Sequence, residues 1–469
     1  MRLYWHQRDL RVPDNRGLHA AATAGVGDGE SDGAVVPVYV FDEAVLSQVG
    51  RPKRAFLAES VRALQSAYRE RGSDLVVREG AAEDVLPELA AEFGADVVVH
   101  ADHYDAARRN RQTRAEAALA RAGVETASRV DNSLVDPSVL DDSYPSHSQF
   151  HDDWQQAPKP DPVPAPDDGA LADVRDDHRL AVPETDATIP EAGYRAARDR
   201  LDSFLADGVE SYSDTRDDLA AAVDDPTSAV SRLSPYLAAG NLGIREVWAA
   251  VGDVYDDATG DARRNVGKYR YELSWREQNY HLLFANPRLQ TENYVDFERD
   301  IRWENDDDHF AAWTRGETGY PLVDAGMRQL YEEGYVHNRP RQVVASFLTK
   351  HLLVDWRRGE RYFADRLVDY DPANNAANWQ WTASTGTDTV DVRIFDPVSQ
   401  MAKYDADAEF VTEYVPELRG VDPEAVVDWP TLRHSERERL APDYHHPIVD
   451  RDHAYDRAQR AFEAALGKR

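Results

Sequence analysis

The first 130 residues alternate short apolar runs with helical patterns, and this alternation constrains the fold more than any other feature. Apolar, β-rich runs occur at 3–5, 35–41, 75–77 and 97–99, and helical patterns lie between them at 54–71, 82–93 and 106–122. Apolar strands that are separated by helices indicate a parallel sheet, buried on both faces and joined by right-handed crossovers. We therefore predict an α/β domain over 1–130.

The composition changes after this region. Between 131 and 192 acidic residues are frequent and prolines alternate with other residues at 158–166. Alternating proline blocks helix and keeps a chain extended, so we predict an interdomain linker over 131–192. Beyond it the patterns are almost wholly helical, which predicts an all-α domain over 193–469. Examples lie at 193–206, 237–251, 265–283, 326–335, 341–356 and 454–466.

A glycine-rich segment at 25–29 superficially suggests a phosphate-binding loop. It precedes an apolar run instead of following one, and Asp28, Glu30 and Asp32 would repel phosphate. We interpret it as an acidic surface loop. The stretch His100-Ala101-Asp102-His103 lacks other converging ligands, so we expect no metal site.

Composition limits the class of protein. The chain has no apolar run long enough to cross a membrane, no apolar secretion signal and no cysteine, so we expect a cytoplasmic protein. The net charge is −32, with 86 acidic residues against 54 basic ones, which is typical of a surface kept soluble at molar salt. Taken alone this charge opposes nucleic-acid binding, although molar salt screens charges beyond roughly 3 Å.

Two helical segments place polar and flat side chains together. Glu272, Trp275 and Arg276 lie at i, i+3 and i+4, and share one helix face. By itself this spacing favours an amphipathic helix with a core Trp and a surface ion pair. The segment 338–342 repeats the spacing with an amide and a guanidinium, and two such faces suit a pocket that reads the edge of a flat heterocycle.

The segment 378–388 adds Trp379 and Trp381, which flank one glutamine. Indole is readily oxidised, so clustered Trp with Asn, Arg and Asp suggests a planar redox cofactor. Together with the blocks 231–235, 319–328 and 393–397, these motifs resemble the photolyase and cryptochrome flavoprotein family. The resemblance is strongest from 228 to 418. It is closest to class I cyclobutane pyrimidine dimer photolyases, with DASH-type cryptochrome features at some positions.

The resemblance implies a fold and a site. The fold would be a five-stranded parallel Rossmann-like sheet, a long extended linker and an all-α domain that binds FAD and carries the catalytic residues. Glu272, Asn338 and Asn375 would be catalytic, and Trp381, Trp356 and Trp303 would relay electrons. FAD would contact Tyr212, Ser231, Arg232, Leu233, Ser234, Arg276, Asn338, Arg341, Asp369, Asp371 and Asn375, and the substrate would contact Glu272, Trp275, Arg339, Gln342 and Trp379.

The activity implied is that of a deoxyribodipyrimidine photo-lyase, a carbon–carbon lyase. Excited reduced FAD would pass an electron to a cyclobutane pyrimidine dimer flipped out of UV-damaged DNA. The alternative is a blue-light photoreceptor, including the DASH type that prefers single-stranded DNA. Gln342 resembles the DASH type, and Tyr335 stands where dimer photolyases carry Trp. We expect a monomer, with a possible second antenna chromophore, deazaflavin or folate, near His6, Arg54 and Asp102.

Overall fold

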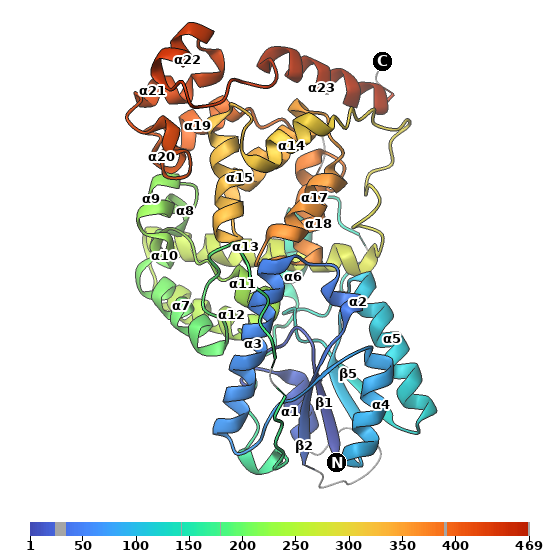
Figure 1. Ribbon diagram of the computed structural model, residues 1–469. Coiled ribbons are helices and arrows are strands. Elements are labelled where there is room, and N and C mark those ends of the chain that lie inside the picture. Colours follow the sequence, from blue (N-terminus) through green and yellow to red (C-terminus); the bar gives the residue numbers. More distant parts are fainter. Residues whose placement is uncertain (24–33, 142, 179, 389–391, 468–469) are drawn as a thin grey trace.

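The computed structural model describes residues 1–23, 34–141, 143–178, 180–388 and 392–467. Its amino-terminal part is a five-stranded parallel sheet with the order β3-β2-β1-β4-β5 (Figure 1). This confirms the predicted sheet, while the glycine-rich segment at 25–29 lies outside the described residues. The strands are β1 (Arg2–His6), β2 (Val35–Phe41), β3 (Val76–Glu79), β4 (Val97–Ala101) and β5 (Glu125–Arg129).

Alternate side chains of the strands enter two cores on opposite faces of the sheet. In β1, Tyr4 packs into the core shared with α1 and α3, whereas Leu3 and Trp5 pack into the core shared with α4 and α5. Figure 1 shows these helix pairs on either side of the sheet. The helices of this part are α1 (Arg16–Ala22), α2 (Glu43–Leu46), α3 (Arg51–Glu70), α4 (Ala82–Phe93) and α5 (Ala106–Arg121).

The carboxy-terminal part is helical, as predicted, and a helix also forms within the predicted linker. That helix, α6 (His147–Gln156), is capped by Ser146, whose hydroxyl accepts a hydrogen bond from the backbone of Gln149. The remaining helices are α7 (Tyr194–Asp207), α8 (Tyr212–Thr215), α9 (Leu219–Asp224), α10 (Pro226–Ala229), α11 (Ser234–Ala239), α12 (Ile244–Asp257), α13 (Gly260–Ala285), α14 (Asp307–Arg315), α15 (Pro321–Glu333), α16 (Asn338–Ser346), α17 (Trp356–Arg366), α18 (Pro372–Ala383), α19 (Pro397–Tyr404), α20 (Glu409–Tyr414), α21 (Pro423–Val427), α22 (His434–Leu440) and α23 (Arg451–Ala465).

Two segments expected as single helices are interrupted. The segment 237–251 is broken where Gly240 adopts a left-handed φ of 74° and ends α11. A Cβ at this position would lie 1.9 Å from the backbone oxygen of Arg8, so glycine is required for the close approach of the two parts. The segment 341–356 is also broken, because α16 gives way to a π-helix at Phe347–His351 and α17 starts only at Trp356.

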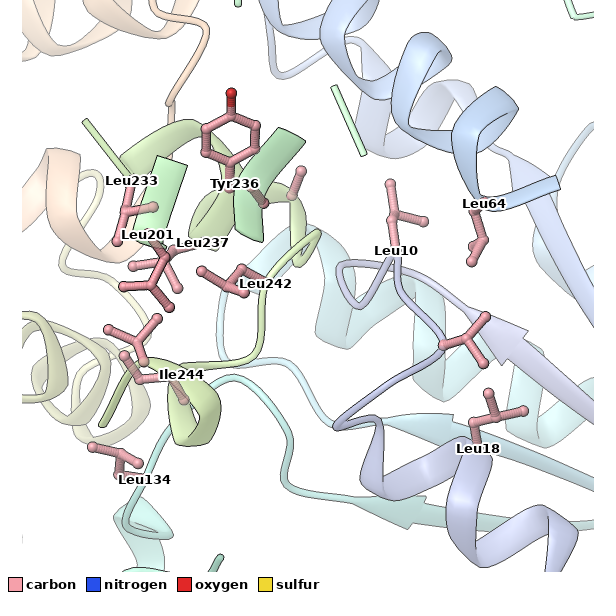
Figure 2. Packing of buried hydrophobic residues seen from close by; sticks show 14 of the residues in the cluster. Leu10, Leu18, Leu64, Leu134, Leu201, Leu233, Tyr236, Leu237, Leu242 and Ile244 are labelled. Atoms are coloured by element: carbon pink, nitrogen blue, oxygen red, sulfur yellow. The ribbon is translucent and has the colours of Figure 1, made fainter. Parts of the chain in front are cut away.

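The sheet part and the helical part share a continuous core. Leu10, Leu18 and Leu64 of the first part belong to the same cluster as Tyr236 and Leu242 of the second, and Figure 2 shows Leu10 between Leu64 and Leu242. Apolar contact across the boundary removes both surfaces from water and therefore fixes how the two parts sit together. The boundaries 1–130, 131–192 and 193–469 stay a prediction.

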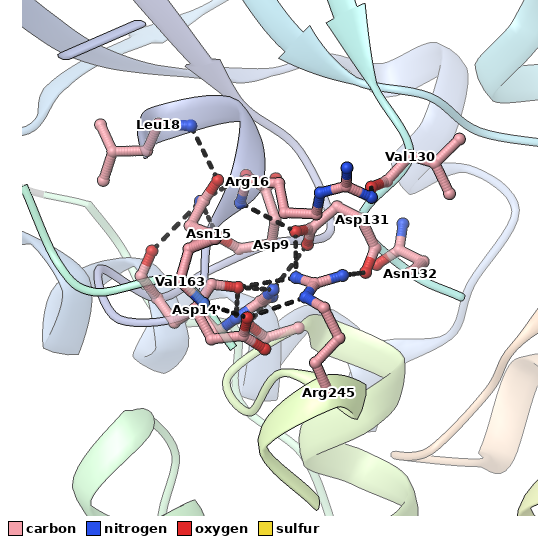
Figure 3. Close-up of polar contacts among 12 residues, drawn as sticks. Asp9, Asp14, Asn15, Arg16, Leu18, Val130, Asp131, Asn132, Val163 and Arg245 are labelled. Atoms are coloured by element: carbon pink, nitrogen blue, oxygen red, sulfur yellow. Dashed lines mark hydrogen bonds and ion pairs between the residues drawn. The ribbon is translucent and has the colours of Figure 1, made fainter. Parts of the chain in front are cut away.

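A buried ionic network reinforces this contact (Figure 3). Arg245 of α12 is fully buried and pairs with Asp14 at 2.8 Å and with Asp131 at 2.7 Å. Arg11 also pairs with Asp131, at 2.7 Å. Buried charges are tolerated when each is paired and hydrogen-bonded, so this network holds α12 in a defined position against the sheet part.

No helix among the described residues is long and apolar enough to cross a membrane.

Candidate active site

A cavity among the described residues lies within the helical part. Its volume is about 330 Å³, which falls in the range of about 300–1,000 Å³ that small-molecule and cofactor sites occupy. The loop before α11 and the helices α13, α16 and α18 contribute most of its wall. The wall combines apolar side chains with a few charged and amide groups, the composition expected of a site for a large polar aromatic ligand.

The cavity gathers most of the predicted site residues but not all of them. Tyr212, Arg232, Trp275, Arg339, Trp356 and Trp303 do not line it. The predicted residues that do line it are Ser231, Leu233, Ser234, Glu272, Arg276, Asn338, Arg341, Gln342, Asp369, Asp371, Asn375, Trp379 and Trp381.

Asp369 is held in the wall with one oxygen unused. Its Oδ2 accepts hydrogen bonds from the Ser234 hydroxyl at 2.6 Å and from Arg341 Nη2 at 2.7 Å. Its Oδ1 is buried and has no hydrogen-bond partner among the described residues. An unsatisfied buried carboxylate oxygen is costly, so this atom is placed to accept a hydrogen bond from a ligand.

Arg8 of the sheet part contacts Asp371, which lines the cavity. The Arg8 guanidinium pairs with Asp371, and it also donates to the Tyr280 hydroxyl at 2.9 Å and to the Ala238 carbonyl at 3.0 Å. Burial opposes ionisation of Asp371, but the charge of Arg8 outweighs it and holds the pKa of Asp371 below its usual range. Asp371 also caps α18 by accepting from the backbone of Asn374 at 2.9 Å. The start of α18, with its pocket residues, is thereby fixed.

Asn375 lies one turn into α18 and contacts a second buried carboxyl. Its Nδ2 donates to Glu360 Oε1 at 3.0 Å and to the Glu360 backbone carbonyl at 3.1 Å. Burial raises the pKa of Glu360. The pair fixes the orientation of the Asn375 amide in the cavity wall.

Glu272 lies in the wall between two cations. Lys268 Nζ is 2.7 Å from its Oε1, and Arg216 forms a hydrogen-bonded ion pair with the same oxygen. Arg216 also lies 3.9 Å from Asp217, which pairs with Arg339 at 2.9 Å. Charges of alternating sign therefore run from α13 to α16 along this side of the site.

Three predicted cofactor or substrate residues lie outside the cavity for identifiable reasons. Arg232 has a left-handed φ of 46°, and its guanidinium turns to Glu333 at 2.7 Å. Tyr212 packs edge-on against Tyr269, which lines the cavity, with ring centroids 5.1 Å apart. Arg339 pairs with Asp217 and donates a hydrogen bond to Gln342 Oε1 at 2.7 Å.

The three predicted relay tryptophans have different surroundings. Trp381 lines the cavity, the Arg393 guanidinium carbon lies 3.6 Å from its ring centroid, and its Nε1 has no described partner. Trp356 is fully buried and donates to Asn293 at 2.9 Å. Trp303 is partly buried and packs edge-on against Phe462. The relay itself stays a prediction.

Several residues with direct contacts to the site were not anticipated from the sequence. Glu360 lies in a highly charged helix segment, Arg357–Arg361, which is typical of a solvated face. Arg216 and His147 touch predicted site residues across sequence separations that carry no periodic signal, and Lys268 touches Glu272 from the same helix. The i, i+4 spacing of Lys268 and Glu272 was the one available local signal.

A smaller cavity lies between the sheet part and α11. Lys53, Arg108 and Arg111 line it beside Tyr39 and Gln7. Lys53 is 3% exposed, its Nζ has no described partner, and burial lowers its pKa to about 7. Arg54, expected here, instead pairs with Glu43 at 2.9 Å, and His6 is held by Tyr68 at 2.7 Å. Asp102 lines another small cavity nearby.

One exposed cluster has the residue types of a metal site. His434, Glu438 and His446 have ligand atoms within 4.8 Å of one another. Arg437 donates to His446 Nδ1 at 3.2 Å, so the ring proton resides on Nε2, which lies 2.8 Å from Glu438. A metal on Nε2 would require the proton on Nδ1, against Arg437. We therefore assign this cluster to surface hydrogen bonding.

Comparisons with known proteins cover the whole chain. A family model described as DNA photolyase matches residues 2–167, and one described as the FAD binding domain of DNA photolyase matches residues 269–464. A deoxyribodipyrimidine photo-lyase of Halobacterium salinarum is 42% identical over 100% of both chains. The crystal structure of a bacterial class III photolyase from Agrobacterium tumefaciens aligns with a TM-score of 0.86, 35% identity, and coverage of 100% of this chain and 98% of that one. An archaeal photolyase from Sulfolobus tokodaii, described with two FAD molecules and a novel light-harvesting cofactor, aligns with a TM-score of 0.84, 29% identity and 99% coverage of each chain.

Proposed function

The chain belongs to the DNA photolyase family, and on that premise we propose that it repairs cyclobutane pyrimidine dimers in UV-damaged DNA with light. The activity is that of a deoxyribodipyrimidine photo-lyase. The observation that carries the proposal is the cavity itself. It brings Asp369, Asn375 and Glu272 to one cavity, in which a buried carboxylate oxygen of Asp369 has no partner among the residues that the structure describes.

The cavity residues fit FAD. When bound, FAD supplies the light-driven electron transfer that opens the cyclobutane ring and takes the electron back. The unused Oδ1 of Asp369 would accept a hydrogen bond from the cofactor, while Ser234 and Arg341 hold the carboxylate in place. Ser231, together with the backbone before α11, would contact the phosphates.

Glu272 would act on the lesion. Lys268 and Arg216 hold its carboxylate in the cavity wall, and a carboxylate there can accept a hydrogen bond from the imide N–H of a flipped pyrimidine. Lys268 and Arg216 would stabilise the negative charge that develops on the pyrimidines of the lesion. Trp275 would offer a flat ring for base stacking, a contact worth roughly 1–3 kcal/mol per base.

We further propose a second, antenna chromophore beside the smaller cavity, which has a volume of about 20 Å³ and would have to widen to admit a large ring. Lys53, Arg108 and Arg111 surround this cavity with cationic groups, which suits an anionic or electron-rich aromatic molecule. Its identity, deazaflavin, folate or a flavin, is open. We further propose that the protein acts as a cytoplasmic monomer at high salt; the excess of 86 acidic over 54 basic residues supports the salt adaptation.

The deciding experiment is a light-dependent repair assay in molar salt. Flavin-loaded, reduced protein is mixed with an oligonucleotide that carries one thymine dimer, single- or double-stranded, and dimer loss is followed under blue light and in the dark. We expect loss in the light only. Dimers that persist in both substrates under light would remove the repair function and favour the photoreceptor alternative.

A further inference from the structure

An imidazole lies flat against Trp275, the tryptophan that is predicted to contact the substrate. The ring centroids of His147 and Trp275 are 3.7 Å apart and their planes differ by 5°. Trp275 shares one face of α13 with Glu272, three residues away, and its side chain is half-buried. A parallel stack covers one face of the indole, so the opposite face is the one left for another flat group.

Both nitrogens of His147 are used to hold its ring. The Tyr271 hydroxyl lies 2.9 Å from Nδ1, and the Ser274 hydroxyl lies 3.0 Å from Nε2. Ser274 donates its own hydrogen to the Tyr271 carbonyl at 2.7 Å, so Nε2 carries the imidazole proton and Nδ1 accepts. His147 is 2% exposed, and burial together with the nearby His151 lowers its pKa to about 3. The ring is therefore neutral and locked at working pH.

The backbone that carries His147 is fixed from two sides. His147 is the first residue of α6, which Ser146 caps, and its backbone N–H donates to Asp388 Oδ2 at 3.4 Å. Asp388 belongs to the loop that follows α18, the helix with Asn375 and Trp379. The position of the imidazole is thus tied to α13, to α6 and to the end of α18.

We propose that His147 is a positioning residue for lesion binding: it fixes the plane of Trp275 so that the free face of the indole can stack on a base flipped toward Glu272. This inference rests on the proposed function. A side chain that is already ordered loses less freedom on binding, which favours the complex. The imidazole is neutral, so it provides a flat backing surface without burying a charge.

The test asks whether a flat ring is needed beside Trp275 or whether any side chain of similar volume is sufficient. His147→Leu fills the volume without a planar surface, whereas His147→Phe restores the plane, and both lose the same two hydrogen bonds. His151→Leu is the matched control, because His151 lies one turn along α6 and contacts the same Ser274 hydroxyl at 2.9 Å without stacking on Trp275. Binding to thymine-dimer and undamaged oligonucleotides is measured for each flavin-loaded variant, with flavin content and repair yield at saturating DNA.

We expect His147→Leu to weaken binding of the dimer oligonucleotide about 3- to 10-fold, the range for immobilising one side chain. Binding to undamaged DNA, flavin content and saturated repair yield should stay unchanged. His147→Phe should restore dimer binding to within about twofold, and His151→Leu should match the wild type. Equal losses for the Leu and Phe variants, or no loss for either, would overturn the inference. A wild-type protein without any preference for dimer DNA would instead refute the proposed function.

Discussion

The side-chain amide nitrogen of Asn375 lies 3.0 Å from Oε1 of Glu360 and 3.1 Å from the backbone carbonyl of the same residue. Both amide hydrogens are therefore donated to Glu360. Asn375 can face a ligand in the cavity only through its carbonyl oxygen, which accepts hydrogen bonds. The carboxyl of Glu360, rather than the ligand, sets the direction of this amide.

Replacing Asn375 by Asp should change the flavin more than the fold. A carboxylate cannot donate to Glu360, and at a pH high enough to ionise both carboxyls the site carries one more negative charge than in the wild type. Any net negative charge here would disfavour a reduced, anionic flavin. We expect the reduction potential to fall by about 60 mV or more, a tenfold change for one electron. A redox titration monitored by flavin absorbance measures it.

Asn378→Asp provides the control for that variant. It makes the same charge change on the same helix, but its amide donates to the Asn374 backbone at 2.7 Å and not to a carboxyl. Its potential should stay close to that of the wild type. An equal shift in both variants would show that charge alone, without Glu360, produces the effect.

Asp369→Asn should weaken FAD binding. The amide of the variant keeps one acceptor oxygen but loses the ion pair with Arg341. An NH₂ group in place of Oδ2 would point its hydrogens at the Ser234 hydroxyl and at Arg341, which are both donors. A hydrogen bond to a charged group contributes roughly 1.5–3 kcal/mol, so the dissociation constant should rise about 10- to 100-fold. Fluorescence titration of the apoprotein with FAD measures this. Asp365→Asn, which breaks an exposed pair with Arg361, should leave it unchanged.

The sequence predicted the framework of the site because its signals are local. The spacing of Glu272 and Arg276 on one helix, and of Asn338 and Arg341 on another, placed these residues together, and all four line the cavity. The sheet was predicted from its apolar strands, which lie where expected except for the polar β5. Such patterns follow from helix and strand geometry alone.

The missed features depend on contacts between distant segments. The sequence pattern around Glu360 is typical of a surface residue. Glu360 is buried only because α17 packs against α18, where Asn375 contacts it. The breaks at Gly240 and after Ser346 follow from tertiary packing, which overrides the helical pattern of the segments. Arg8 contacts Asp371 across 363 positions, a distance at which periodicity carries no information.

Gly359→Ala should distort the cavity wall. A Cβ at this position would lie 2.2 Å from the ring of Trp379, so the indole or α17 must move. Overpacking of this kind typically destabilises a protein by about 1–3 kcal/mol. We expect a lower melting temperature and a lower FAD-to-protein ratio. Gly252→Ala is the matched control: it lies in α12 with open space around it, so it should stabilise the helix by roughly 0.5–1 kcal/mol.

Glu272→Gln should separate repair from cofactor binding. The variant keeps the shape of the side chain but removes the charge that Lys268 and Arg216 contact. We expect repair yield per absorbed photon to fall about tenfold, because a charge-assisted hydrogen bond contributes roughly 1.5–3 kcal/mol. Flavin content should be unchanged. Asp261→Asn, an exposed change on the same helix, is the control, and loss of flavin from Glu272→Gln would refute the assigned role.

His351→Phe should make the protein more stable in acid. The imidazole is buried in the π-helix, stacks on Phe347 at 5.1 Å, and has no described partner for either ring nitrogen. Burial lowers its pKa to about 4, whereas an unfolded chain has a His pKa near 6.5. Between these values the unfolded state binds more protons than the folded state, so stability is lost as the pH falls from about 6.5 to about 4.

Phe keeps the stacked ring and removes the titrating group. At pH 8 the free energies of unfolding of the two proteins should differ only through packing. At pH 5 this difference should shift by roughly 2 kcal/mol in favour of the variant, because His351 is protonated in the unfolded wild type and neutral in the folded wild type. Urea unfolding at pH 5, 6 and 8 measures this, with His453→Gln, an exposed substitution in α23, as the control. A stability difference that is constant across this range would show that His351 is protonated in the folded protein, where a partner such as Asp396 would have to turn toward it.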